Sequence, residues 1–158
     1  AQETASQILN QTGMKGGLVV HLGCGDGAIT AALRANAGYL VHGLDTDPEN
    51  VARARQHAQT LGVYGKVAID RLDGRSLPYA DNLVNLLVAE ELGKVSMDEC
   101  LRVLAPQGEA FIQTAGKWKK WSSRGRKISM SGRITFTTLA AIRWPATAWS
   151  ARRAICNG

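Results

Sequence analysis

A glycine-rich stretch near the N-terminus has the residue types and spacing of a ligand-binding turn. It consists of Gly23, Cys24, Gly25, Asp26 and Gly27, and it follows an apolar run over residues 18–22. Glycine lets the backbone turn tightly and approach a ligand without a clash at Cβ. The N–H groups at the start of a following helix can bind a carboxylate or a phosphate. The same spacing, with alanine at position 28, also satisfies the relaxed dinucleotide fingerprint, so the turn alone leaves the ligand open.

Two aspartates further along the chain indicate that the ligand contains a nucleoside. Asp45 ends a second apolar run, where a carboxylate can accept both hydroxyl groups of a ribose. Asp73, followed by Gly74, comes after a third apolar run, where a carboxylate can accept the exocyclic amine of an adenine. Asp47 precedes Pro48 and is interpreted as the N-cap of a helix. These positions predict nucleoside binding without choosing the cofactor.

The elements that must position these residues alternate between strands and helices. Short apolar, β-prone runs predict strands at residues 18–22, 39–44, 66–70, 83–88 and 109–113. Capping and turn residues predict helices at residues 1–14, 28–37, 47–61 and 96–104, the last opened by a capping box of Ser96 and Glu99. The alternation predicts an α/β fold, a Rossmann-like, doubly wound and mostly parallel sheet. Ligands of such sheets bind at the carboxyl ends of the strands.

Four stretches of the chain resemble the successive motifs of class I S-adenosylmethionine (SAM) methyltransferases. They read HLGCGDG, GLDTDPENVARAR, DRLDGRSLPYADNLVNLLVAEEL and CLRVLAPQGEAFI, in that family's order and at about its spacing. The resemblance implies the class I methyltransferase fold with SAM as the cofactor, in preference to NAD. It also implies that the glycine turn holds the methionine part, that Asp45 and Thr46 meet the ribose and adenine, and that Asp73 and Gly74 meet the adenine edge. The implied cofactor-binding residues are Gly23, Cys24, Gly25, Asp26, Gly27, Asp45, Thr46, Asp73, Gly74, Ala89 and Glu90.

Several positions depart from the pattern of that family. His21 stands where the family usually has an acid that helps to anchor the ammonium group of the cofactor, and a protonated imidazole there would repel that group. Asn85 replaces a frequent aspartate, and Gln107 replaces the first glycine of the usual Pro-Gly-Gly turn. Glu90 and Glu91 are candidate general bases by position alone. The residues therefore favour cofactor binding more strongly than catalysis.

The charge of the chain changes sign near residue 117. Residues 1–116 hold 9 Lys or Arg and 13 Asp or Glu, whereas residues 117–158 hold 10 Lys or Arg, no acidic residue and all four tryptophans. We expect a SAM-binding domain over residues 1–116, with the N-terminal helix included. It lacks candidates for the last two strands of a complete fold, and an open sheet edge invites self-association. Three widely spaced cysteines predict neither a disulfide framework nor a metal site, and we expect Cys24 and Cys100 to be small buried apolar residues. No apolar run is long enough to span a membrane.

The basic segment 117–158 has three interpretations. Its tryptophans and cations could form a nucleic-acid-binding arm, or the segment could be a disordered tail. The third interpretation starts from residues 19–111, which particularly resemble the methyltransferase-like domain of bacterial secreted proteins with PQQ-binding-like β-propellers. When the residues from Trp121 onward are reverse-translated and the nucleotides are read in a frame shifted back by one, the possible codons include a sequence that resembles the next part of that family. We therefore expect a frameshifted translation from about Trp121 and no nucleic-acid partner.

Four functions follow from these observations. The first is a SAM-dependent methyltransferase with an unknown methyl acceptor, or the cofactor-binding remnant of one. The second is a non-catalytic nucleotide- or SAM-binding module of a larger secreted β-propeller protein, for which the resemblance implies an extracytoplasmic location. An NAD-dependent oxidoreductase is the third, and a nucleic-acid-binding protein the fourth.

Overall fold

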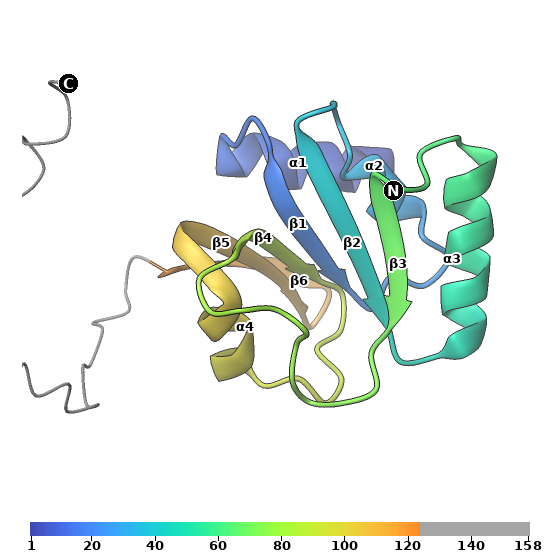
Figure 1. Cartoon of the computed structure of the whole chain (residues 1–158). Coiled ribbons are helices and arrows are strands. Elements are labelled where there is room, and N and C mark those ends of the chain that lie inside the picture. The colour runs from blue at the N-terminus through green and yellow to red at the C-terminus, as the bar shows by residue number, and fades with distance from the viewer. Residues whose placement is uncertain (124–158) are drawn as a thin grey trace, which may run out of the picture. The chain divides into compact units, whose positions relative to one another are not determined.

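The computed structural model describes residues 1–123 and arranges them around one six-stranded sheet (Figure 1). The helices are α1 (Gln2–Thr12), α2 (Ala28–Ala32), α3 (Pro48–Thr60) and α4 (Met97–Val103). The strands are β1 (Gly17–Leu22), β2 (Tyr39–Asp45), β3 (Val67–Arg71), β4 (Val84–Ala89), β5 (Leu104–Thr114) and β6 (Lys117–Ser122).

The strands lie in the order β3-β2-β1-β4-β5-β6, and the first five are parallel. The predicted fold class, a Rossmann-like, doubly wound and mostly parallel sheet, is confirmed. The connections change direction between β1 and β4, which are neighbours in the sheet although they are far apart in the chain. In open parallel sheets, the carboxyl ends of the strands on either side of such a point leave a crevice for a ligand.

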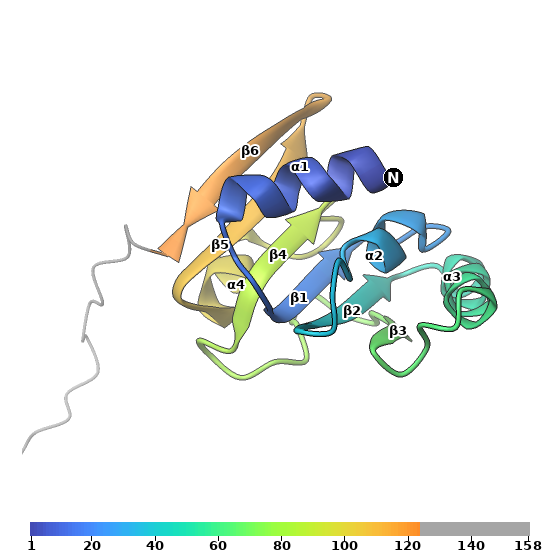
Figure 2. The ribbon, with the colours of Figure 1, turned by 90° about the horizontal axis from the view of Figure 1, so that it is seen from above.

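Helices cover both faces of the sheet, unequally (Figure 2). Helices α1 and α3 bury residues such as Ile8 and Ala54 in one core, together with β-strand residues that include Val19 and Phe111. On the opposite face, α4 buries Cys100 and Val103 in a second core. The connection over residues 72–83 completes that second core without a helix, so a loop forms part of its cover.

Local capping explains where the helices begin and end. Asp47 caps α3 by accepting the N–H of Glu49 at 2.9 Å, and Pro48 follows at the first helical position, as predicted. The prediction of a helix over 28–37 is wrong in length, because α2 ends at Ala32. The amide side chain of Asn36 accepts the N–H of Gly38 at 2.7 Å, and this local turn competes with a further helical turn.

The predicted capping box of α4 forms only in half. Ser96 is the N-cap, and its hydroxyl accepts the N–H of Glu99 at 3.2 Å. The Glu99 carboxylate does not turn back to the Ser96 backbone. It binds the N–H of Leu77 at 2.7 Å and the guanidinium of Arg102 instead. A carboxylate gains more from a cation and a loop donor than from one helix-end N–H.

The expectation that no strand follows the fifth is wrong, because β6 pairs with β5 in an antiparallel hairpin. Its two-residue turn has positive φ at Ala115 (49°) and Gly116 (73°), the backbone sign of a type I′ turn. That turn favours Asn-Gly, so the Ala-Gly pair gave no hairpin signal in the sequence. Lys120 fastens β6 to the domain, with its Nζ 2.9 Å from Glu109 Oε1 and 3.0 Å from the carbonyl oxygen of Gln11.

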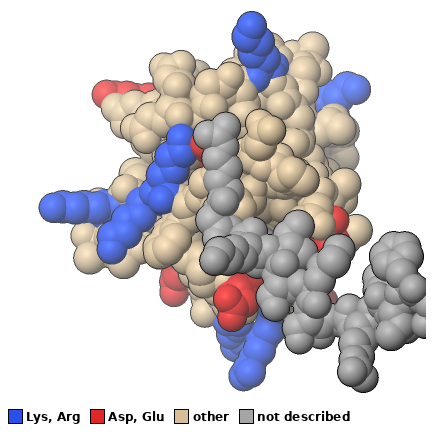
Figure 3. All heavy atoms as spheres, turned by 90° about the vertical axis from the view of Figure 1, so that its left-hand side faces the viewer, with Lys and Arg blue, Asp and Glu red and all other residues tan. Residues whose placement is uncertain are grey.

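Among the described residues, β3 and β6 are the two edge strands of the sheet. Three lysines, Lys117, Lys119 and Lys120, lie on β6. Figure 3 shows the molecule from the left-hand side of Figure 1, with several Lys and Arg side chains on its left and others at its top, right and bottom. Lysines on an edge strand oppose pairing with a second copy, so the self-association expected at an open edge has to overcome like-charge repulsion.

The predictions of a disordered or frameshifted tail and of a nucleic-acid-binding arm lie, from residue 124 onward, outside the described residues. Within the part of the chain that the structure describes, no helix is both long enough and apolar enough to cross a membrane. The same described residues contain no group of His, Cys, Asp and Glu side chains suited to hold a metal ion.

The backbone at Gln107 leads to a first prediction. Gln107 is exposed and has a left-handed φ of 69°, and the next residue, Gly108, is buried where a Cβ would lie 2.8 Å from the carbonyl oxygen of Ala105. Because glycine removes the left-handed penalty, Gln107→Gly should raise the free energy of unfolding by about 1 kcal/mol, measured by urea denaturation. Gly108→Ala should lower it. If Gln107→Gly is less stable than the wild type, the left-handed backbone at Gln107 is not strained.

Candidate functional site

A cavity of about 490 Å³ opens at the carboxyl ends of β1, β2 and β4. It brings together six of the predicted site residues, which are Gly23, Gly25, Asp45, Thr46, Glu90 and Glu91. Sequence reasoning did not predict the remaining lining residues, which are Leu22, Leu44, Asp47, Asn50, Leu72, Leu92, Gly93 and Gln113. Four of them, Leu22, Leu44, Leu72 and Gln113, lie at or directly beside the end of a strand, and that position is the signal in the sequence that could have found them.

The Asp45 carboxylate is the centre of the hydrogen-bond network at this cavity. Its Oδ2 accepts the N–H of Gly25 at 2.9 Å and the side-chain amide of Asn50 at 3.2 Å, and its Oδ1 accepts the N–H of Asp47 at 2.9 Å. The backbone carbonyl of Asp45 accepts the N–H of Leu72 at 2.8 Å. One residue therefore ties the glycine turn, the start of α3 and the loop after β3 to the end of β2.

The glycines of the turn have different tasks. Gly25 has φ 53° and open space where a Cβ would be, so its backbone is free to contact a ligand. Gly27 has φ 81°, and a Cβ there would lie 2.8 Å from the Cβ of Ala54. Its glycine is therefore required for packing against α3. Asp26 is exposed, and its carboxylate accepts the N–H of Ala28 at 3.0 Å in a local turn just before the N-cap of α2, which is Gly27.

Cys24 and Cys100 are buried, as the sequence predicted. Burial raises the pKa of the Cys24 thiol to about 12, with the nearby Asp45 acting in the same direction. The thiol is therefore protonated at neutral pH and is not a nucleophile. Its side chain faces β2, where a Cβ on Gly43 would lie 3.2 Å from the Cys24 Cβ.

Six predicted site residues lie outside the cavity lining: Cys24, Asp26 and Gly27 of the turn, and Asp73, Gly74 and Ala89. Asp73 is exposed and forms an ion pair with Arg71, with Oδ1 3.0 Å from Nε. Gly74 follows it in the same exposed segment, and Leu72 contributes the wall of the cavity at this point. Ala89 is fully buried beneath the site.

The lining carries negative charge. Asp45, Asp47, Glu90 and Glu91 contribute four carboxylates, and no Lys or Arg is among the described lining residues. Glu90 and Glu91 are exposed on the loop after β4. Close carboxylates produce a negative potential, so this cavity favours a ligand that carries positive charge.

His21 lies beneath the glycine turn and is only 1% exposed. Its Nδ1 is 2.8 Å from the hydroxyl of Thr30, and its Nε2 has no partner among the described residues. Burial lowers the pKa of His21 to about 4, against the opposing effect of Asp45. The imidazole is therefore neutral at physiological pH, and the repulsion that a protonated ring would exert on the ammonium group of the cofactor does not arise there. Asn85 lies at the start of β4, at the opposite end of the sheet, where its side-chain oxygen accepts the N–H of Leu18 at 2.9 Å.

Comparison with known proteins identifies the class. A family described as a methyltransferase domain matches residues 19–108, so the chain belongs to the methyltransferase-domain family. The match spans β1 to the beginning of β5 and so includes the glycine turn, Asp45 and the loop after β4. The family, together with similar solved structures of SAM-dependent methyltransferases, indicates S-adenosylmethionine as the cofactor.

The chain is similar to several individual proteins over part of their length. It is 26% identical over 98 residues to an uncharacterised protein of Haemophilus influenzae and spans 39% of that protein. A SAM-dependent methyltransferase from Aquifex aeolicus matches 68% of the chain with a TM-score of 0.60 and 23% identity, and the chain covers 62% of it. Geranyl diphosphate C-methyltransferase from Streptomyces coelicolor A3(2), solved with S-adenosylhomocysteine, matches 70% of the chain with a TM-score of 0.62 and 19% identity, and the chain covers 44% of it. The cyclase SpnF matches 73% of the chain with a TM-score of 0.63 and 26% identity, and the chain covers 47% of it.

The burial of His21 predicts sensitivity to acid. The pKa is 6.5 for an ordinary histidine and about 4 in the folded chain, so between these values the unfolded chain binds a proton that the folded chain does not. The contribution of the buried, neutral His21 to the free energy of unfolding is fully present above pH 6.5. The contribution of His21 then falls by about 1.4 kcal/mol for each pH unit as the pH drops towards 4.

This effect is measured by urea denaturation of the wild type and of His21→Gln between pH 7 and pH 4. The wild-type curve should be steeper than that of His21→Gln. The control is His57→Gln, which changes a half-exposed histidine on α3 and should follow the wild type. Parallel curves for wild type and His21→Gln would contradict the burial of a neutral ring.

Proposed function

We propose that the cavity binds SAM and that the chain is the cofactor-binding part of a SAM-dependent methyltransferase, whose methyl acceptor is not identified. The observation that carries the proposal is the convergence of Gly25, Asp45 and Leu72 on one cavity at the switch point of the sheet. Bound SAM supplies a methyl group that is already activated on a sulfonium. The task of the protein is then largely to hold the cofactor and the methyl acceptor in the right orientation to each other.

The residues present fit this cofactor. SAM carries positive charge on its sulfonium and ammonium groups, and the lining supplies four carboxylates without a Lys or Arg. Asp45 already accepts three hydrogen bonds, which leaves about one of the four lone-pair positions of a carboxylate for a ribose hydroxyl. Gly25 leaves its backbone open to the methionine part, as proposed for the glycine turn.

The other proposed contacts lie around this centre. Thr46 lines the adenine side of the cavity beside Leu72, and Asp73 and Gly74 reach the adenine edge from the exposed loop that follows Leu72. Asp73 can accept an exocyclic amine while its second oxygen keeps the ion pair with Arg71. Glu90 and Glu91 lie at the end of β4, where they can stabilise the sulfonium charge or take a proton from the acceptor.

A second candidate is a non-catalytic SAM- or nucleotide-binding module of a larger secreted protein. Two observations favour it. His21 is a neutral group at the position of an acid, and the two candidate general bases, Glu90 and Glu91, are exposed. SpnF, which has a similar fold, is named for a cyclisation rather than a methyl transfer. Conversion of SAM to S-adenosylhomocysteine in the presence of an acceptor would exclude this candidate.

The proposal predicts selective binding that depends on Asp45. Isothermal titration should show binding of SAM and S-adenosylhomocysteine and no binding of NAD. Asp45→Asn should raise the Kd of S-adenosylhomocysteine about 10- to 100-fold, because hydrogen bonds to a charged group contribute about 1.5–3 kcal/mol. Asp98→Asn, an equal change of charge on the exposed face of α4, is the control and should bind as the wild type does.

Circular dichroism at the titration temperature shows whether Asp45→Asn is folded, since Asp45 also joins three segments of the chain. A folded Asp45→Asn variant with unchanged affinity would overturn the proposed binding mode. Preference for NAD over S-adenosylhomocysteine would overturn the proposed function itself.

A further inference from the structure

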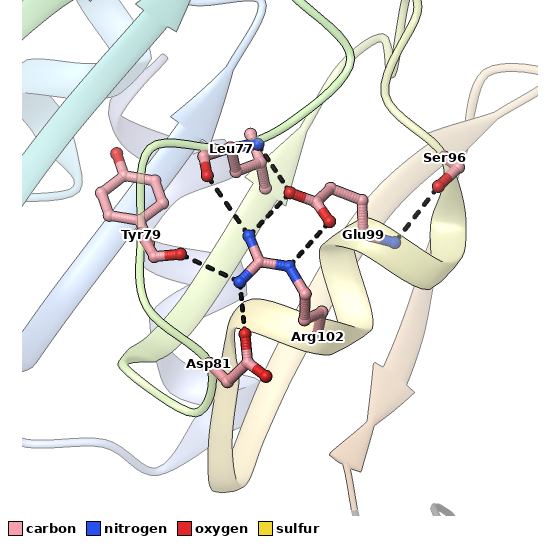
Figure 4. A network of polar contacts seen from close by, with 6 residues as sticks. All are labelled: Leu77, Tyr79, Asp81, Ser96, Glu99 and Arg102. Carbon is pink, nitrogen blue, oxygen red and sulfur yellow. Dashed lines mark hydrogen bonds and ion pairs between the residues drawn. The ribbon is translucent and has the colours of Figure 1, made fainter. Parts of the chain in front are cut away.

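We propose that Glu99 and Arg102, which lie outside the cavity, are positioning residues that hold the adenine-side loop of the cofactor site in its binding conformation. This inference rests on the proposed function, because it assigns the loop after β3 to the adenine. The two residues lie one turn apart on α4 and grip the loop that connects β3 to β4 (Figure 4). We call this pair the Glu99–Arg102 clamp.

Arg102 makes the larger set of contacts. Its guanidinium forms a two-pronged ion pair with Glu99, with Nε–Oε2 at 2.8 Å and Nη2–Oε1 at 2.7 Å. It also donates to the backbone carbonyls of Leu77 at 3.3 Å and Tyr79 at 3.0 Å, and to the carboxylate of Asp81. The planar, forked shape of a guanidinium suits this geometry, whereas an ammonium group cannot reach all of these acceptors at once.

Glu99 binds the same loop through the backbone of Leu77. Its Oε1 accepts the N–H of Leu77 at 2.7 Å, so the clamp binds both the N–H and the C=O of the same residue. The side-chain hydrogen bond from Arg102 lowers the pKa of Glu99 to about 2, so the carboxylate stays ionised through the physiological range. Helix α4 is itself held by the buried Cys100 and Val103, which makes it a rigid support.

The clamp is the second of two anchors on a short span of chain. The first anchor is Leu72, whose N–H binds the carbonyl of Asp45 and whose side chain lines the cavity. The second is Leu77, which is buried and held by the clamp. Between them lie four exposed residues, 73–76, and among the described residues this span is held by the ion pair of Asp73 with Arg71. The position of Asp73 therefore depends on both anchors.

A further contact ties the same loop to the sheet. The hydroxyl of Tyr79 is 2.6 Å from Nδ1 of His42 on β2, and Nε2 of His42 is 3.0 Å from Asp70. Because the carbonyl of Tyr79 is held by Arg102, the loop is fixed on one side to α4 and on the other to β2. A loop that is ordered before binding loses less conformational freedom when the ligand arrives, which strengthens affinity.

The test uses Arg102→Lys and Glu99→Gln, with Asp98→Asn as the control on the same helix. Two ligands are titrated: S-adenosylhomocysteine and S-ribosylhomocysteine, which lacks the adenine. In Arg102→Lys and Glu99→Gln the Kd of S-adenosylhomocysteine should rise about tenfold, the factor expected when one or two loop residues must be ordered on binding. The Kd of S-ribosylhomocysteine should not change, and Asp98→Asn should bind both ligands like the wild type.

A second measurement needs no ligand. Arg75 lies in the exposed span 73–76, so trypsin cleavage after Arg75 reports how firmly the span is held. Glu99→Gln should be cut there several-fold faster than the wild type and Asp98→Asn, at a temperature where circular dichroism shows all three folded.

The proposal is overturned if both clamp variants bind S-adenosylhomocysteine as tightly as the wild type does and Glu99→Gln is cut by trypsin no faster than the wild type. An equal loss of affinity for both ligands would also overturn it, because that result indicates a general structural defect. If the wild type binds neither ligand while Glu99→Gln is cut faster, the proposed function fails and the anchoring of the loop stands.

Discussion

The geometry of the site depends on the hydrogen bonds that the carboxylate of Asp45 accepts. The glycine turn and the start of α3 donate hydrogen bonds to this carboxylate, and the loop after β3 donates one to the backbone carbonyl of the same residue. Each segment leaves the carboxyl end of a different strand or enters the next helix, so the sheet brings them to one edge and Asp45 fixes their spacing. The side chain is 7% exposed, and burial of a charge in this way is tolerated because hydrogen-bond donors surround it.

Charge separates the two faces of the glycine turn. Above the turn, the cavity collects four carboxylates, which suit a cationic cofactor. Below it, His21 is buried and neutral where related proteins usually carry an acid, and Cys24 is a protonated thiol. The site therefore draws its negative potential from Asp45 at the end of β2 and from Asp47, Glu90 and Glu91 on the exposed loops at its rim, rather than from β1 beneath the glycine turn. Rim carboxylates are more exposed to solvent, so salt screens them more strongly.

The sequence predicts features that depend on local rules and misses those that depend on packing. The alternation of strands and helices, the Asp47 cap and the buried cysteines follow from periodicity and residue chemistry, and the structure agrees with them. The capping box failed because Glu99 had a stronger partner in Arg102, which no local rule identifies. Strand β6 was missed because its turn uses Ala115 at positive φ, and Leu72 was missed because a plain apolar residue carries no sign that it faces a cavity.

The strand order has a consequence for how this domain assembles. Within β1 to β3, and again within β4 to β6, each strand pairs with one that is close in the chain, and β1–β4 is the strand pair that joins the two halves of the described sheet. The cavity straddles this seam, since Gly25 and Asp45 belong to the first half and Glu90 and Gln113 to the second. A molecule bound in the cavity contacts both halves at once. Its binding free energy therefore stabilises the form of the domain in which β1 and β4 are paired. Ligand binding therefore stabilises the pairing of β1 with β4 as well as the loops of the site.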